Sequence, residues 1–232
     1  MGASVFVVRQ GEQIVRQHQP VVFNPKSPAQ VAQRAMMKLA SQLSAVMKTH
    51  ITPMKQAASK GQSSRNVFVK SLFVDNAMSF ANDKATADLS KLKLTASVLD
   101  GMSIVSGGIT VEGLNTTITV RPYADFKENA TVFAVILRSD ASNGVEVIGY
   151  NHANVTSAEA NTTITVNTSI NAAAGDIVLL YIARVEPSKL PTIYRNMYAS
   201  SGAAAMLDVL QREVPSALTY SKTLNEIIPT QG

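Results

Sequence analysis

The chain has 232 residues, of which 46% are hydrophobic and 16% charged, and it contains no cysteine and no tryptophan. This composition is typical of a folded protein with room for one large domain or two small ones. It excludes disulfide bonds, thiol catalysis and cysteine-ligated metals.

The charge is unevenly distributed along the chain. Residues 1–74 carry ten Lys or Arg against one acid, Glu12, which gives +9, whereas residues 75–232 carry eleven against fifteen, which gives −4. Such asymmetry indicates that the N-terminal part contacts nucleic acid or another polyanion. A solvated basic face, or a docking surface for an acidic subunit, explains it equally well.

The start of the chain does not read as a secretory signal, because its apolar run is short and is interrupted by Arg9. The longest apolar run, residues 177–183, is far below the roughly 20 residues that span a bilayer. We therefore expect a soluble protein made in a cytoplasm, with no membrane partner.

Two short apolar segments, residues 3–8 and 13–16, flank Gly11 and predict a hairpin. A helix-start signal follows at Ser27, a candidate N-cap, with Pro28 in the first helical position and Gln30 placed for a reciprocal capping box.

From Val31 onward, apolar residues recur at spacings of three and four, which predicts a long amphipathic helix. We expect a break or kink of this helix near Pro53, because proline lacks a backbone donor and disfavours the helical conformation of the residue before it, and we expect the element to end at Gly61.

Residues 24–60 include no acid, and the helix presents basic side chains opposite its apolar stripe. Basic side chains along a helix neutralise phosphates without reading sequence. The candidate residues for contact with nucleic acid or an acidic partner are Arg34, Lys38, Lys48, Lys55, Lys60, Arg65 and Lys70.

After Gly61, Ser63 or Ser64 is placed to cap a second, shorter helix that includes Phe68 and Leu72. A strand through residues 67–69 is the competing interpretation. Residues 75–90 are polar and small, and we expect a linker there.

From residue 91 the sequence pattern is typical of short strands separated by turn residues, which predicts a β-sandwich or barrel. The expected strands are KLKLTASVL (91–99), MSIVS (102–106), GITVEG (108–113), NTTITVRP (115–122), ATVFAVILRSD (130–140), VEVIGYN (145–151), NTTITVNTSI (161–170) and DIVLLYIARVEP (176–187). A single helical turn is expected within residues 122–128.

An internal repeat supports this interpretation. Residues 115–120 and 161–166 are both NTTITV, an offset of 46, and the same offset relates the apolar strands 130–138 and 176–184. We expect two similar strand pairs in one sandwich, with the two apolar strands central and buried. The inward-facing side chains would be Ile118, Val120, Ile164 and Val166, and Arg138 and Arg184 would extend to solvent where the apolar strands leave the core.

The expected fold is therefore α+β: an N-terminal hairpin and a long helix kinked near Pro53, then an antiparallel β-sandwich of Ig-like or jelly-roll-like type, and an extended or helical C-terminal tail. The expected division is a basic region (1–74), a linker (75–90), a sandwich domain (91–187) and a C-terminal arm (188–232), with a short helix over 201–212.

The sequence contains few candidate catalytic or metal-binding groups. Its three histidines, His18, His50 and His152, are scattered, and we expect His50 to be a surface or packing residue. Glycine-rich phosphate loops, nucleophile elbows and HExxH motifs are missing from the sequence. We expect no enzymatic activity and no cofactor or metal.

The N-terminal third resembles a family from tailed phages and related elements of Bacteroidota hosts. Its members carry a hairpin around a glycine, then I-x-R, then N-P-x-[ST]-x-x-Q-x-x-Q-R before a long helix. The matching residues are Gly11, Ile14 to Arg16, Asn24 to Ser27, Gln30, Gln33 and Arg34, with a later S-x-N-x-F-V-K at 64–70. The resemblance covers about residues 5–70 and implies a virion structural protein without catalytic residues. A late A-G-D-x-V at 174–178 is similar to Ig-like members.

Two functional hypotheses follow. The first is a bacteriophage virion protein, capsid-associated or in the portal and tail assembly, which is assembled in the host cytoplasm and contacts other virion proteins, its own copies and the genome. The second is a soluble protein that binds nucleic acid without sequence preference. A carbohydrate-binding sandwich is a third class, which the scarcity of Trp and Tyr disfavours.

Overall fold

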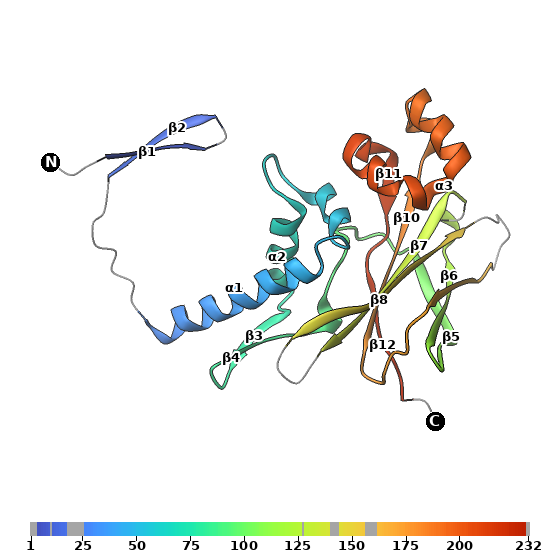
Figure 1. Cartoon of the computed structure of the whole chain (residues 1–232), viewed down its shortest axis with the longest axis horizontal. Coiled ribbons are helices and arrows are strands. Elements are labelled where there is room, and N and C mark those ends of the chain that lie inside the picture. The colour runs from blue at the N-terminus through green and yellow to red at the C-terminus, as the bar shows by residue number, and fades with distance from the viewer. Residues whose placement is uncertain are drawn as a thin grey trace.

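The computed structural model describes residues 4–9, 11–17, 26–126, 128–139, 144–155 and 162–230. The chain is α+β, as expected. Two antiparallel sheets pack face to face, and a layer of helices and a small hairpin covers the other face of the larger sheet (Figure 1). The Asn24-Pro25 step of the helix motif and Asn161 of the repeat lie outside the described residues.

The predicted N-terminal hairpin is confirmed. Strands β1 (Ser4–Arg9) and β2 (Glu12–Gln17) pair antiparallel, with Phe6 opposite Val15 and Val7 opposite Ile14. Gly11 takes a positive φ of 86° between them, a conformation that glycine adopts without steric cost.

Helix α1 (Pro28–Val46) begins as predicted, because the Ser27 side chain accepts a hydrogen bond from the Gln30 backbone N–H at 3.4 Å. The reciprocal half of the capping box is not formed, since Gln30 Oε1 has no hydrogen-bond partner among the described residues. The helix is broken before Gly61, but the break comes earlier than the break or kink expected near Pro53. The helix ends at Val46, and Pro53 lies in a separate 3-10 helix, η1 (Thr52–Ala57).

The segment after α1 packs into the core, because Met47, Ile51 and Met54 are all buried. Pro53 then occupies the first turn of η1, where a missing backbone donor carries no penalty.

Helix α2 (Ser64–Val74) confirms the helical interpretation of this segment. Ser63 caps it by accepting from the Asn66 backbone N–H at 3.3 Å. Phe68 and Leu72 are buried on its inner face.

Residues 75–90 are not a plain linker. They contain the antiparallel hairpin of β3 (Met78–Ala81) and β4 (Lys84–Ala87), which packs against α1, and the start of the 3-10 helix η2 (Leu89–Lys91). The strand expected over 91–99 is also not formed. The Thr223 hydroxyl takes the place of a partner strand there, accepting from the backbone N–H groups of Leu94 at 2.7 Å and Thr95 at 3.2 Å.

The smaller sheet has the order β5-β6-β9, and the larger has the order β11-β10-β7-β8, with β12 also paired to β10. The smaller sheet contains β5 (Met102–Glu112), β6 (Asn115–Pro122) and β9 (Ile164–Thr168). The larger contains β7 (Ala130–Ser139), β8 (Val145–Val155), β10 (Ile177–Val185), β11 (Leu218–Tyr220) and β12 (Leu224–Ile227). The two strands expected at 102–106 and 108–113 form the single strand β5, whose register on β6 shifts between Ile104 and Ile109.

Strands β7 and β10 are the buried central pair that the sequence predicts. On β7, alternate side chains enter two cores: Phe133, Val135 and Leu137 face the helical layer, and Val132 and Ala134 face the smaller sheet. The expected helical turn after β6 is also formed, as η3 (Ala124–Phe126).

The internal repeat is confirmed as paired structure. The two NTTITV copies lie side by side, with Thr119 opposite Thr165, and the two apolar strands do the same, with Ala134 opposite Leu180. The two residues of each of these central pairs are 46 positions apart, which is the repeat offset, and the strands run antiparallel, so a local two-fold axis relates the copies. The side chains expected to face inward are buried between the sheets: Ile118, Val120, Ile164 and Val166.

The C-terminal part is not an arm. Helix α3 (Thr192–Glu213) is interrupted at Gly202, whose φ is 79°, and its second half buries Met206 and Leu207 against the larger sheet. Between the helix and the sheet lie the short 3-10 turns η4 (Pro187–Lys189) and η5 (Pro215–Ala217). The chain then returns to pair with β10 as β11 and β12.

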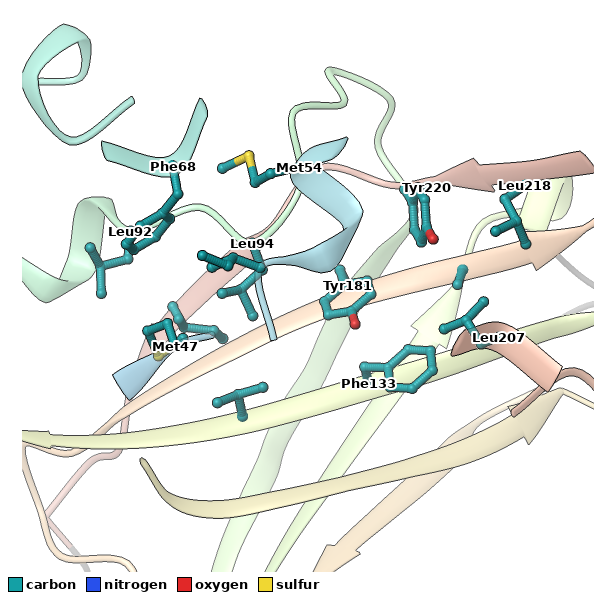
Figure 2. Packing of buried hydrophobic residues seen from close by; sticks show 14 of the residues in the cluster. Met47, Met54, Phe68, Leu92, Leu94, Phe133, Tyr181, Leu207, Leu218 and Tyr220 are labelled. Carbon is teal, nitrogen blue, oxygen red and sulfur yellow. The ribbon is translucent and has the colours of Figure 1, made fainter. Parts of the chain in front are cut away.

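One hydrophobic core joins the helical layer to the larger sheet. Figure 2 shows Met47, Met54 and Phe68 on the helical side facing Tyr181 and Phe133 of the sheet. This core therefore contains residues from the region before residue 75, from residues 75–90 and from the chain after residue 90.

Candidate interaction surface of the helical layer

The seven predicted contact residues are all exposed: Arg34, Lys38, Lys48, Lys55, Lys60, Arg65 and Lys70. Arg34 and Lys38 are four residues apart on α1, on the face opposite the buried Leu39 and Leu43, so their charged groups are neighbours. The expected cationic face of α1 is present.

Arg65 has a structural contact in addition to its charge. Its Nε donates a hydrogen bond at 2.9 Å to Ser44 Oγ, and that hydroxyl donates at 2.8 Å to the Ser41 backbone oxygen. Arg65 therefore links α2 to α1.

Lys55 and Lys70 also lie in local structure. Lys55 Nζ donates to the Gln62 backbone oxygen at 3.4 Å, which ties η1 to the turn before α2. Lys70 lines a cleft of about 320 Å³ together with Asp75 and Lys93, which pair with each other at 2.7 Å.

The seven charges are not gathered on one surface. Arg65 and Lys70 are five residues apart on α2, so they project about 140° apart around its axis. Among the described residues, no carboxylate lies within 4.0 Å of the charged groups of Lys38, Lys48, Lys55, Lys60, Arg65 and Lys70. Ion pairs within the described part of the chain therefore do not neutralise these six groups, and the layer has a positive field available to an anionic partner.

The structure adds a feature that the sequence interpretation missed. On the N-terminal hairpin, Phe6 is 73% exposed, Val8 69% and Val15 58%. Alternation places Phe6 and Val8 on one face of β1, and Val15 lies directly opposite Phe6. The alternating pattern was visible in the sequence, but whether the body covers this apolar face is shown only by the structure.

An aromatic cluster connects the helical layer to the sheet. His50, after α1, packs on Tyr150 of β8 with ring centroids 4.7 Å apart, and Phe133 stacks on Tyr181 at 5.0 Å. Burial lowers the pKa of His50 and raises that of Tyr150. His50 is a packing residue, as expected.

Within the described residues, no group of three His, Asp or Glu side chains converges in a way that could hold a metal ion. No helix in that part of the chain is both long and apolar enough to cross a membrane. Comparison of the chain with protein-family models, with curated proteins and with solved structures gave no match.

Proposed function

We propose that this chain is a structural protein of a bacteriophage virion, capsid-associated or part of the portal and tail assembly, and that it is assembled in the bacterial cytoplasm. In this proposal the paired sheets form an Ig-like or jelly-roll-like sandwich that contacts neighbouring subunits and other virion proteins. The resemblance of residues 5–70 to a phage family supports the virion assignment.

The observation that carries the proposal is the apolar face of the N-terminal hairpin. A two-stranded hairpin is marginally stable by itself in water, and burial of a large apolar side chain stabilises by about 1.5–3 kcal/mol. Phe6, Val8 and Val15 are exposed, so packing against another subunit would stabilise the hairpin and the assembly together. Exposed apolar patches often mark sites of protein–protein contact.

The basic helical layer adds a second contact. Arg34 and Lys38 on the outer face of α1 would meet packaged nucleic acid or the acidic surface of a neighbouring subunit. The charge of −4 on residues 75–232 makes a neighbouring copy a suitable acidic partner.

The test is the mass of the purified full chain, measured by light scattering over a range of protein concentrations at about 50 mM and about 200 mM salt. Growth of the mass with concentration, together with rings or shells in electron micrographs, is the expected result. A monomer under every condition would contradict the proposal.

The alternative is a soluble protein that binds nucleic acid without sequence preference. The outer face of α1 favours it, since Lys38 is exposed and has no carboxylate within 4.0 Å among the described residues. Its test is DNA binding in the same buffers. Replacement of Arg34, Lys38 and Lys48 by Gln is expected to reduce the slope of log K against log salt by about 0.9 for each lost phosphate contact.

A matched control removes three charges from another region, by K189Q, R195Q and R212Q. Equal weakening of DNA binding by both triple variants would show that net charge alone is responsible and would overturn the alternative.

A further inference from the structure

A groove lies on one side of the paired sheets, between β5 of the smaller sheet and β12 of the larger sheet. Its volume is about 490 Å³, and its apolar lining includes Ile104, Val105, Leu224 and Ile227. In the described part of the chain, β5 is paired only to β6, and β12 only to β10. The outer edge of β5 can therefore accept a further strand. Residues 90–92 lie against β12, where Asn225 Nδ2 donates to the Ser90 and Leu92 backbone oxygens.

Asp100, Lys222 and Glu226 lie beside the apolar lining of this groove. Leu224 and Glu226 lie on the face of β12 that is turned toward the smaller sheet, and Asp100 lies at the groove in an ion pair with Lys222. Ile227 at the rim is 55% exposed. The groove thus offers apolar contacts beside carboxylates.

The N-terminal hairpin has the complementary character. Phe6, Val8 and Val15 form its exposed apolar face, and β1 and β2 are paired only to each other in the described part of the chain. A strand added to a sheet edge binds through backbone hydrogen bonds and gains specificity from alternate side chains that enter pockets. The hairpin of a neighbouring molecule meets both requirements at this groove.

The position of α1 favours a neighbouring molecule over the hairpin's own body. The N-terminal end of α1 points away from β5 and β12, which lie on the other side of the molecule (Figure 1). Residues 18–25 join the hairpin to α1, and eight residues span at most roughly 26–29 Å. The hairpin is therefore tethered at the end of the molecule that is remote from its own groove.

We propose that the N-terminal hairpin of one copy docks in the groove between β5 and β12 of a second copy, with Phe6, Val8 and Val15 against the apolar lining. This contact is heterologous, because two different surfaces meet, and repetition of it generates a ring or a filament. The inference rests on the proposed assembly function and specifies its interface.

The test uses site-directed crosslinking of the full chain, which has no native cysteine. Phe6→Cys is made in one preparation and Ile227→Cys in a second preparation of different mass, and the two are mixed and oxidised. The expected result is a crosslink that contains one chain of each kind. The control replaces F6C by L114C, because Leu114 in the β5–β6 turn is also apolar and 75% exposed.

Two further variants test the chemistry of the contact. Val8→Ser with Val15→Ser in the F6C chain is expected to lower the crosslinked fraction at limiting concentration by roughly 10- to 100-fold. Val105→Lys in the groove chain, which places a charge in the apolar lining, is expected to lower it more than Val98→Lys, which places the same charge at an exposed site outside the groove.

Each other outcome contradicts the inference. If the protein assembles but F6C crosslinks I227C no better than L114C does, the docking site is wrong and the assembly function stands. If F6C crosslinks mainly to F6C, the hairpins pair with each other. If a dilute F6C/I227C double variant crosslinks within single chains, the hairpin occupies its own groove. If the chain remains monomeric, the proposed function fails together with the inference.

Discussion

Arg138 of β7 and Asp176, in the turn before the neighbouring strand β10, form a bidentate ion pair. Arg138 Nε lies 3.0 Å from Asp176 Oδ1, and Nη2 lies 2.6 Å from Oδ2. In the two-fold repeat the equivalent pair is Arg184 and Ala130, which cannot form an ion pair, and Arg184 donates instead to the Asp125 backbone oxygen. Both arginines lie where their strands leave the core and are partly exposed, as expected, but Arg138 also forms this ion pair, which the sequence did not predict.

This asymmetry gives a matched pair of variants. Asp176 is buried, so Arg138→Met leaves its carboxylate with the Ala173 backbone N–H as its remaining described donor. We expect a loss of about 2 kcal/mol in unfolding free energy, less than for a fully buried pair because Arg138 is partly exposed. Arg184→Met is expected to change it by less than about 0.5 kcal/mol. Urea unfolding measures the loss in each variant, and equal losses would contradict a stabilising role of the Arg138–Asp176 ion pair.

The shared core predicts that the helical layer and the sheets unfold together. Phe68 is fully buried between α2 and this core, so Phe68→Ala is expected to lower the unfolding free energy by about 3–5 kcal/mol. Val74→Ala on the exposed side of the same helix serves as the control. Fluorescence of the sheet tyrosines and circular dichroism should report one transition. A separate early transition of the helical signal in the wild-type protein would show that the layer folds independently.

The His50–Tyr150 contact predicts a pH dependence. Burial lowers the pKa of His50 in the folded state, so the unfolded chain binds a proton more readily. Stability is therefore unaffected by this group well above its ordinary pKa of about 6.5, falls as the pH drops below that value, and levels off below the folded pKa.

The measurement is the urea midpoint at about pH 7.5 and about pH 5.5. His50→Gln is expected to remove most of the difference between these midpoints. The carboxylates of Asp88 and Glu186, whose pKa values are lowered by hydrogen bonds from Ser90 and Lys189 respectively, lose their stabilising effect only near and below their ordinary pKa values of about 4. An unchanged pH dependence in the His50 variant would contradict the account.

Local patterns predicted most of the elements. Ser27 and Ser63 cap helices because their side chains can bond the third backbone N–H group that follows. The continuous apolar character of residues 130–138 and 176–184 predicted strands that are buried on both faces. The two NTTITV segments predicted two similar strand pairs in one core.

The errors arise where long-range contacts decide the structure. Leu92 and Leu94 alternate as in a strand, but the backbone there bonds the Thr223 side chain, 129 residues beyond Leu94. The strands β11 and β12 contain three and four residues, too few for a periodic signal, and they exist because β10 supplies a partner.

The candidate surface could be predicted only in part, because long-range contacts also decide some of its features. Basic residue types are visible in a sequence, so the exposure of Lys38 and Lys48 could be expected. The contact of Arg65 with Ser44 depends on how α2 crosses α1, which is decided by packing and not by local pattern. The exposed face of Phe6 and Val15 likewise depends on what the rest of the fold leaves uncovered.

The most direct test of assembly through the hairpin is sedimentation velocity of the full chain beside the F6S/V8S/V15S variant, over a wide range of protein concentrations. Because these side chains are exposed in the single chain, the substitutions should leave the Tm of the body unchanged. The account predicts that the wild-type protein forms larger species as concentration rises and that the variant remains a monomer. Identical sedimentation of the two proteins would contradict it.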